Sequence, residues 1–402
     1  MRQRKPPRPA GEGVGGEGNM YNKKTKILLT GGGTGGSVAP LLAITDKLGQ
    51  KKYKYLWIGT RKGPEREMIK AESIHPVKFS ETDVLPAKQF NRIKFKSIVS
   101  TKFRRYFSLR TFLAPLWIIV GFIQSLFIIL AFRPRWIISA GGFVSVPVVW
   151  AGWLLGRKIL IHQQDAQSGL ANKLMAPFAK VITVAFEKSL RDYGKKAKWI
   201  GNPTRVGTGQ FTPPNGLGCP VLTKQKQKSF NLKSDLPVVL ILGGGTGSMF
   251  INKLVADSLE DLIKFCQIIH VTGKGKQPDN IPVSIANYYQ YDFLNFNQMA
   301  EAYQQADVVV SRCGMSTLAE LSYLGKPSIL IYLPGHQEYN ARIFEEYSAA
   351  IVLDQPVLEK TFFINHLKNL LDDEKLQKLL SKNIKKVLKT GASQELAKII
   401  KT

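Results

Sequence analysis

A run of glycines follows a short apolar stretch near the start of the chain. Residues Leu28–Pro40 read LLTGGGTGGSVAP, with five glycines in the six positions from 31 to 36. Glycine lets backbone N–H groups come close to a ligand, and the N-terminus of the helix that should follow carries partial positive charge. The stretch therefore predicts a strand-to-helix turn able to receive a phosphate group, with a turn that binds no ligand as the alternative.

A second glycine turn repeats this order in the other half of the chain. Residues 238–255 read VVLILGGGTGSMFINKLV, again an apolar run, a glycine turn and a helical pattern. Short β-branched runs alternate with longer helical stretches in both halves, which is typical of parallel strands joined by crossover helices. The sequence predicts an α/β protein with two Rossmann-like, doubly wound domains facing each other across a cleft.

Chain length and composition predict how these domains are divided. At 402 residues the chain is longer than a single core usually supports. Residues 1–24 are basic and rich in Gly and Pro, so we expect a disordered tail. We expect an N-terminal domain over 25–201 and a C-terminal domain over 202–387, with an insertion at 212–232. A helix at about 388–402 should pack back on the first domain.

The net charge of +28 predicts an anionic partner. Nucleic acid, an acidic membrane surface and phosphorylated substrates all satisfy this expectation, and charge alone does not choose among them. The three cysteines are far apart and form no C-x-x-C pair, which argues against a disulfide framework or a zinc site.

A long apolar segment favours the membrane among these partners. Residues 111–132 carry no charge and are numerous enough to span a bilayer, but they lie between two expected strands of one sheet. We therefore expect a helix with one face in the core and one apolar face at the membrane interface. The twenty residues before it hold seven Lys or Arg and no acid, which suits anionic lipids. The candidate membrane residues are Arg104, Arg105, Phe112 and Trp117. No nucleic-acid module is recognised, so we expect no nucleic-acid partner.

A dinucleotide enzyme is the first rival interpretation. Gly31, Gly33 and Gly36 satisfy its G-x-G-x-x-G pattern, but that fingerprint also needs an acid at the end of the second strand. Here the second strand ends in WIGTRKG, with no acid before Glu65. No P-loop pattern G-x-x-x-x-G-K-[ST] occurs either, so both nucleotide-binding classes are disfavoured.

Four further segments follow predicted strands, where this architecture places its cleft. They are SAGGFVSVP (139–147), IHQQDAQSGLANK (161–173), GNPTR (201–205) and the stretch 311–341, which contains CGMSTLAE and PGHQEYNA. Together with the two glycine turns, this order of motifs resembles the MurG family of membrane-associated transferases, in glycosyltransferase family 28. The likeness extends from about Lys26 to the C-terminus, with its main gap at the insertion.

The resemblance implies the GT-B fold. It also implies an inverting transferase that moves N-acetylglucosamine from UDP-GlcNAc to undecaprenyl-linked muramyl-pentapeptide in peptidoglycan biosynthesis. Such an enzyme would sit peripherally on the cytoplasmic side of a bacterial cell membrane and would use anionic lipids as partners. Two alternatives stay open. One is a catalytically weakened protein that only binds a nucleotide sugar or lipid, and the other is a transferase with a different lipid-linked acceptor.

In the C-terminal half the resemblance implies a donor site. Glu320 would accept hydrogen bonds from the uridine ribose, Arg205 would pair with the diphosphate, and Gln337 would contact the sugar. The donor-binding residues implied are Arg205, Gly244, Gly245, Thr246, Thr317, Glu320, His336 and Gln337. No D-x-D sequence occurs, so we expect neither a metal nor another cofactor, with amides, helix dipoles and Arg205 stabilising the leaving UDP.

In the N-terminal half the resemblance implies an acceptor site, and here the sequence departs from the family. The acceptor-binding residues implied are Thr34, Gly35, Gly36, Ser37, Gln164 and Asp165. Ser37 stands where the family usually has a histidine, and a hydroxyl is a poor base at neutral pH. The usual HEQN reads HQQD, which places Asp165 where an amide is expected. Asp165 and Ser37 are therefore the catalytic candidates, with Asp165 as hypothetical general base. Simple drift of a hydrogen-bonding residue is the alternative.

Overall fold

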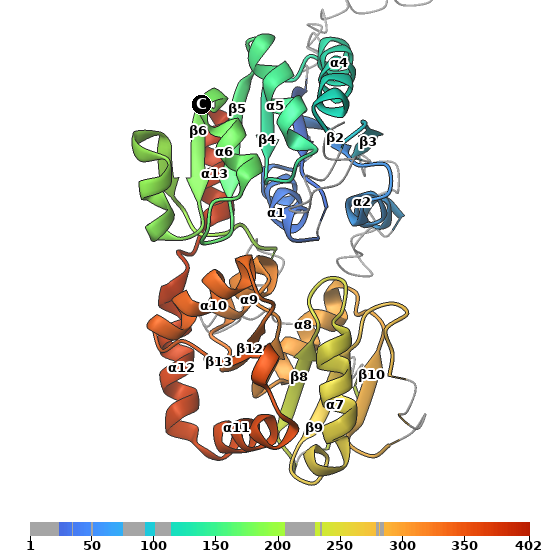
Figure 1. The fold of residues 1–402 in the computed structure, drawn as a ribbon, viewed down its shortest axis with the longest axis vertical. Helices are drawn as coiled ribbons and strands as arrows, with labels where there is room; N and C mark the ends of the chain where they lie inside the picture. The colour runs from blue at the N-terminus through green and yellow to red at the C-terminus, as the bar shows by residue number, and fades with distance from the viewer. Residues whose placement is uncertain are drawn as a thin grey trace, which may run out of the picture.

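The structure, a computed structural model, describes residues 24–33, 35–49, 51–74, 93–100, 114–205, 230–233, 235–278, 281 and 285–402. In these residues the chain forms two α/β units, one above the other in Figure 1. Some expectations lie outside the described residues: most of the tail (1–23), most of the insertion (212–229), and the candidates Thr34, Arg104, Arg105 and Phe112.

The first unit is built on a parallel sheet with the strand order β3-β2-β1-β4-β5-β6-β7. Its strands are β1 (Thr25–Thr30), β2 (Tyr53–Gly59), β3 (Lys94–Ser97), β4 (Trp136–Ser139), β5 (Lys158–Gln163), β6 (Val181–Val184) and β7 (Ala197–Trp199). Ile27 and Leu29 point to one face of β1 and Leu28 points to the other, and all three are fully buried. Strands that are apolar on both faces need helices on both sides of the sheet.

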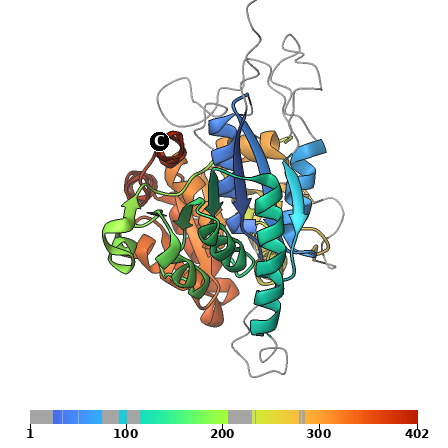
Figure 2. The same ribbon diagram turned by 90° about the horizontal axis from the view of Figure 1, so that it is seen from above.

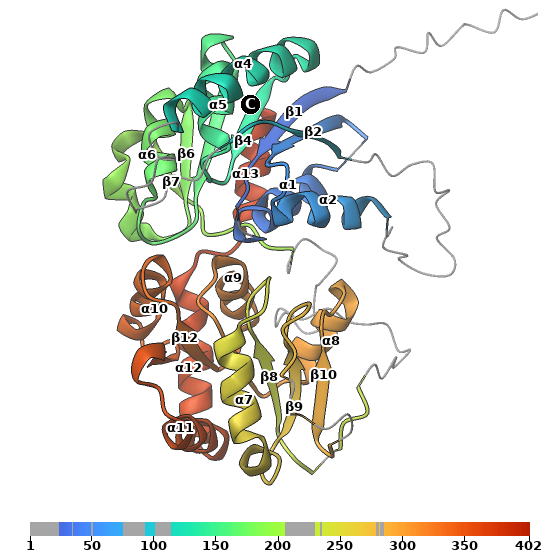
Figure 3. The ribbon, with the colours of Figure 1, turned by 45° about the vertical axis from the view of Figure 1, so that its right-hand side comes forward.

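Helices cover both faces of this sheet (Figure 3). On the face of Ile27 lie α1 (Ala39–Leu48), α2 (Pro64–Ile74) and the C-terminal helix α13 (Ala392–Lys401). On the face of Leu28 lie α4 (Ala114–Phe132), α5 (Ser145–Leu154) and α6 (Leu170–Met175).

The second unit repeats the plan with the parallel strand order β10-β9-β8-β11-β12-β13. Its strands are β8 (Val238–Leu242), β9 (Gln267–Val271), β10 (Tyr288–Tyr291), β11 (Val308–Ser311), β12 (Ser328–Tyr332) and β13 (Ile351–Asp354). Its helices are α7 (Met249–Leu262), α8 (Phe296–Gln305), α9 (Met315–Leu324), α10 (His336–Glu346), α11 (Lys360–Asp372) and α12 (Glu374–Val387). The two doubly wound sheets confirm the fold that the alternating pattern predicts.

The C-terminal helix returns to the first unit. Trp136 of β4 donates its indole N–H to the carbonyl of Ile400 over 3.0 Å, and Leu396 of α13 is fully buried in the core of the first unit. The chain thus crosses between the units twice, near Gly201 and near Lys389. A Cβ on Gly201 would lie 1.9 Å from the carbonyl oxygen of Lys389, so the two crossings touch. The domain limits themselves stay predictions.

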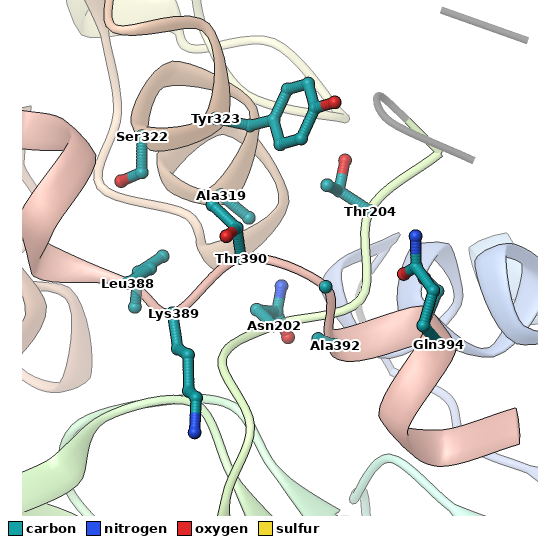
Figure 4. Close-up of a pocket in the computed structure, with 12 residues that line it drawn as sticks. Asn202, Thr204, Ala319, Ser322, Tyr323, Leu388, Lys389, Thr390, Ala392 and Gln394 are labelled. Atoms are coloured by element: carbon teal, nitrogen blue, oxygen red, sulfur yellow. The ribbon is translucent and has the colours of Figure 1, made fainter. Parts of the chain in front are cut away.

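A cavity of about 270 Å³ lies at these crossings. Figure 4 shows Asn202 and Thr204 from the first crossing, Lys389 and Thr390 from the second, and Tyr323 of α9 around it. This cavity is separate from the cleft between the two glycine turns.

Helix α4 has one buried and one exposed side, as the sequence predicts. Ile129 is fully buried, whereas Phe127 is 71% exposed. Figure 2 shows α4 on the outside of the first unit. The large exposed apolar side chains of α4 are Leu116, Trp117, Ile119, Ile123, Phe127 and Leu130, which we call the α4 apolar face. Among the described residues, no helix has both the length and the apolar character to cross a membrane.

Candidate active site

A cleft of about 620 Å³ lies between the two units and is lined by both glycine turns. From the first unit it receives Gly32–Ser37, except the undescribed Thr34, together with the loop around Gly141 and residues 163–165. From the second unit it receives 243–246, Arg312, Gly314, Met315, His336 and Gln337. These segments follow the carboxyl ends of parallel strands, where doubly wound sheets bind their ligands.

The first glycine turn leads into α1 through a short 3₁₀ helix, Gly35–Ser37. Gly33 has a φ of 91°, a conformation that favours glycine, and the carbonyl of Gly31 accepts a hydrogen bond from the indole of Trp57 over 3.2 Å. Gly35, Gly36 and the buried Ser37 all line the cleft. The structure therefore brings the described residues of this predicted turn together on one wall.

Asp165 lies where the two units meet. Its Oδ1 accepts a hydrogen bond from Nδ2 of Asn340 on α10 over 2.9 Å, while Oδ1 of Asn340 accepts one from the backbone N–H of Ala166 over 2.8 Å. Burial raises the pKa of the Asp165 carboxyl, against the lowering effects of the Asn340 hydrogen bond and of His336. Gln164 also lines the cleft and donates to the carbonyl of Ala140 over 3.0 Å.

Asn340 is a bridging residue that the sequence analysis missed. It is fully buried and contacts Asp165, Ala166 and the carbonyl of Cys313, which it reaches over 3.3 Å. Its only signal in the sequence is its place in PGHQEYNA, one turn after the predicted sugar contacts.

The second glycine turn is held by close backbone packing. A Cβ on Gly247 would lie 2.0 Å from the carbonyl oxygen of Thr272, and Gly247 has a φ of 73°. Ser248 caps α7 by accepting from the N–H of Ile251 over 3.3 Å. Gly244, Gly245 and Thr246 line the cleft just before this helix. Their amides and the helix N-terminus make an environment suited to an anion.

Arg312 is a second residue that the sequence analysis missed. It lines the cleft, is only 7% exposed, and its Nε and Nη2 donate to Ser248 Oγ over 3.1 and 2.8 Å. Nη1 donates to the carbonyl of Ile331 over 3.2 Å. Its position directly after a buried strand, in SRCG, was the available signal. Arg312 therefore brings a guanidinium to the wall of the cleft made by the second unit.

Arg205 is placed differently from the other donor candidates. Its Nε lies 2.8 Å from Oδ2 of Asp46 on α1, and it is not among the described residues that line the cleft. Its predicted contact with a diphosphate stays a prediction. His336 and Gln337 do line the cleft at the start of α10, where Gln337 Oε1 accepts from the N–H of Leu333 over 3.2 Å.

Thr317 and Glu320 lie further along α9 and are not among the described residues lining the cleft. Oε2 of Glu320 accepts a hydrogen bond from the hydroxyl of Tyr303 on α8 over 2.8 Å. Burial raises the pKa of Glu320 to about 7, and the Tyr303 hydrogen bond partly opposes this rise. Glu320 is thus a carboxyl that changes charge near neutral pH. Among the described residues, no cluster of His, Cys, Asp or Glu is arranged to hold a metal ion.

A Tyr303→Phe variant should raise the pKa of Glu320 further above its value of about 7, because it removes a donor that favours the ionised carboxylate. The measurement is a carbon-13 NMR titration of the Glu320 carboxyl, assigned with Glu320→Gln. Tyr289→Phe removes the hydroxyl of a half-buried tyrosine that donates to the carbonyl of Asn231, and it serves as control. An unchanged Glu320 titration in Tyr303→Phe would contradict the role of this hydrogen bond.

Two doubly wound domains with a shared cleft at the carboxyl ends of their strands define the GT-B fold. Models of the glycosyltransferase family 28 N-terminal and C-terminal domains match residues 27–184 and 238–401. The chain belongs to glycosyltransferase family 28.

Relatives agree with this assignment, and solved structures share the fold. The chain is 34% identical to the UDP-N-acetylglucosamine–N-acetylmuramyl-(pentapeptide) pyrophosphoryl-undecaprenol N-acetylglucosamine transferase of Clostridium kluyveri, over 86% of this chain and 91% of the relative. The enzyme of the same name from Clostridium tetani is 33% identical, over 87% and 91%. MurG of Acinetobacter baumannii superposes with a TM-score of 0.65 at 21% identity, over 94% of this chain and 99% of that structure. UDP-GlcNAc 2-epimerase from Neisseria meningitidis also reaches 0.65, at 12% identity over 94% and 100%, and so shares the fold.

Proposed function

We propose that this protein is an inverting glycosyltransferase that moves N-acetylglucosamine from UDP-GlcNAc to undecaprenyl-pyrophosphoryl-MurNAc-pentapeptide, as the names of its relatives state for them. The observation that carries the proposal is a likeness of 34% over 91% of such a relative. The cleft supports it independently, because it has a glycine turn on each wall and so offers two places for a diphosphate. The product would be the disaccharide-linked lipid precursor of peptidoglycan.

The donor would lie on the wall made by the second unit. The starts of α7, α9 and α10 meet at the cleft, where 243–246, Gly314 and His336 line it. Their partial positive charges, with the guanidinium of Arg312, would stabilise the diphosphate as it leaves. Glu320 would bind the ribose hydroxyls. This arrangement needs no metal to hold the leaving group.

The acceptor would lie on the wall made by the first unit. An acceptor sugar hydroxyl attacks the anomeric carbon, a C–O bond forms, and the bond to the diphosphate oxygen breaks with its electron pair on UDP. The hydroxyl proton passes to a base, for which we propose the Asp165 carboxylate. Its raised pKa and its place on the cleft support this role.

Acceptor-dependent UDP release tests the proposal. The full chain is incubated with UDP-GlcNAc and a short-chain analogue of the lipid-linked muramyl-pentapeptide, beside a reaction without acceptor. Release that depends on the acceptor is expected. UDP-GlcNAc binding without release would instead favour a weakened binding protein or a transferase for another lipid-linked acceptor.

We also propose that the protein acts on the cytoplasmic side of a bacterial cell membrane as a peripheral protein. The α4 apolar face supports this, because six large apolar side chains on one helix are open to solvent. Basic residues just before α4 in the sequence suit anionic headgroups. We expect stronger sedimentation with vesicles of phosphatidylglycerol or cardiolipin than with neutral vesicles. The absence of a nucleic-acid partner stays a prediction.

A Phe127→Ser change on the α4 apolar face should weaken binding to anionic vesicles about ten- to a hundredfold, because burial of a phenylalanine is worth about 1.5–3 kcal/mol. The matched control is Phe362→Ser on α11, since Phe362 is 51% and Phe127 71% exposed. Vesicle sedimentation measures both. Equal losses in the two variants, or none in Phe127→Ser, would count against α4 as the membrane contact.

A further inference from the structure

Glu65, at the start of α2, is a buried carboxylate that the proposed reaction leaves without a role. It is 0% exposed, and Oε1 accepts hydrogen bonds from the N–H and the hydroxyl of Thr60 over 2.7 and 2.6 Å. Oε2 accepts from the N–H of Gly33 over 3.3 Å. Among the described residues Glu65 forms no ion pair with a cation. Its charge is therefore stabilised by donors from the first glycine turn and from the loop after β2.

Two glycines leave the space that this carboxylate occupies. A Cβ on Gly32 would lie 2.5 Å from Oε1, and a Cβ on Gly63 would lie 2.1 Å from Oε2. Neither glycine has a positive φ, so backbone conformation does not require glycine at either position. A side chain there would force the carboxylate away from its hydrogen bonds. Part of the glycine in GGGTGG thus makes room for Glu65 and not for a ligand.

Glu65 also fixes the direction of one amide in the turn. The N–H of Gly33 donates to Oε2 of Glu65 and therefore points at this carboxyl. The carbonyl of Gly32 is packed against the neighbouring loop, where a Cβ on Gly142 would lie 2.5 Å from it. The peptide between residues 32 and 33 is therefore held from both sides and cannot turn its N–H toward a ligand.

The amides that remain for a ligand lie further along the turn. Gly35 and Gly36 follow Gly33 in the same turn, at the start of the short 3₁₀ helix. Gly35 and Gly36 line the cleft. Thr60, the other partner of Glu65, lines the cleft as well. One carboxylate thus ties together two segments of the acceptor wall.

We propose that Glu65 is a positioning residue for the acceptor: it holds the first glycine turn so that the N–H groups of Gly35 and Gly36, and not that of Gly33, meet the acceptor's anionic group. This inference rests on the proposed function, because it takes the first wall as the acceptor site. Glu65 itself does not contact a substrate in this proposal. Removal of the charge should therefore affect the acceptor and leave the donor wall unchanged.

Glu65→Gln and its matched control Glu67→Gln, an exposed acid in the same first turn of α2, test the proposal. In Glu65→Gln an NH₂ group replaces one carboxyl oxygen and so faces the backbone N–H of either Gly33 or Thr60, which can only donate, so one of the two segments loses its acceptor. We expect affinity for the short-chain acceptor analogue, measured by calorimetry, to fall on the order of tenfold in Glu65→Gln. UDP affinity should be unchanged, and Glu67→Gln should match the parent protein in both measurements.

Unchanged acceptor affinity in Glu65→Gln, or an equal loss of UDP affinity, would overturn the proposal. Calorimetry reports binding without turnover. A parent protein that binds the analogue but releases no UDP would therefore refute the proposed function. The inference about Glu65 would still be tested by the affinity of its variants for the analogue. Glu65→Asp keeps the charge but is one methylene shorter, and it should fall between the parent and Glu65→Gln.

A thermal unfolding cycle checks the arrangement without any ligand. Gly32→Ala should lower Tm by several degrees in the parent protein, because the new methyl group meets the carboxylate. In a Glu65→Ala background the same change should cost much less, since the space is then free. Additive effects would show that Glu65 does not determine the glycine at 32, and would remove the steric basis of the proposal.

Discussion

Replacing Glu320 by glutamine should raise the KM for UDP-GlcNAc about 100-fold. A carboxylate can accept from both ribose hydroxyls, and hydrogen bonds to a charged group contribute about 1.5–3 kcal/mol each. Glutamine keeps one acceptor oxygen and replaces the other with a donor, so about 2–3 kcal/mol of donor binding is lost. Its shape also allows the hydroxyl of Tyr303 to keep its partner, which limits damage to α8 and α9. Steady-state kinetics at saturating acceptor measures the effect.

The pH dependence of donor binding is the second part of this prediction. The pKa of Glu320 is about 7, so between pH 6 and 8 the carboxyl passes from mostly neutral to mostly ionised. Because the ionised form is the better acceptor, the KM for UDP-GlcNAc in the parent protein should fall as pH rises. This dependence should disappear in Glu320→Gln.

A nucleotide without ribose hydroxyls is the control for both parts. 2′,3′-Dideoxy-UDP has no group for Glu320 to bind, so the parent protein and Glu320→Gln should bind it with equal affinity. If the variant loses affinity for dideoxy-UDP as strongly as for UDP, the substitution has disturbed the second unit in general, and Glu320 is not the ribose contact.

The fold could be predicted because its signals are local. Two glycine turns in the same order and fully apolar strands such as Val238–Leu242 predict parallel sheets, and both sheets are confirmed. The two-sided nature of α4 followed from a long apolar segment placed between two expected strands of one sheet. In each case the information lies within about twenty consecutive residues.

The candidate site could be predicted only in part, because its bonds join distant segments. The motif GNPTR predicts that Arg205 contacts a diphosphate in the cleft. In the structure Arg205 forms an ion pair with Asp46 of α1, and nothing in GNPTR indicates this partner. Asn340 reaches Asp165 from a stretch 175 residues away. In the sequence, Glu65 is noticeable only as an acid that lies beyond the position required by the dinucleotide-binding fingerprint. Its burial under the glycine turn depends on tertiary packing, which no local pattern reports.

The replacement of the family's histidine by Ser37 leads to the prediction with the largest expected effect. If Asp165 is the base, Asp165→Asn should lower kcat by about 10²–10⁴, the usual contribution of a positioned base. Asparagine can still accept the hydrogen bond from Asn340 through its own Oδ1, so the junction between the units should survive. UDP affinity should be unchanged, which separates loss of the base from loss of the cleft. A variant that keeps its kcat and pH profile would leave Asp165 as a junction residue only.

The exchange Ser37→His together with Asp165→Asn tests whether the base has moved from one position to the other. This double variant restores the usual family residues at both positions, and both positions line the same cleft. If the two positions are alternative places for one base, Ser37→His should recover much of the kcat lost in Asp165→Asn. The acid limb of kcat should then move from the raised pKa of the buried Asp165 carboxyl to that of an imidazole, near 6.5. A double variant as slow as Asp165→Asn would show that Asp165 has a role that a histidine at 37 cannot supply. In that case the acid limb of kcat in the parent protein shows whether Asp165 acts as the base or only as the hydrogen-bond partner of Asn340. Only a base must lose its proton before the acceptor hydroxyl reacts.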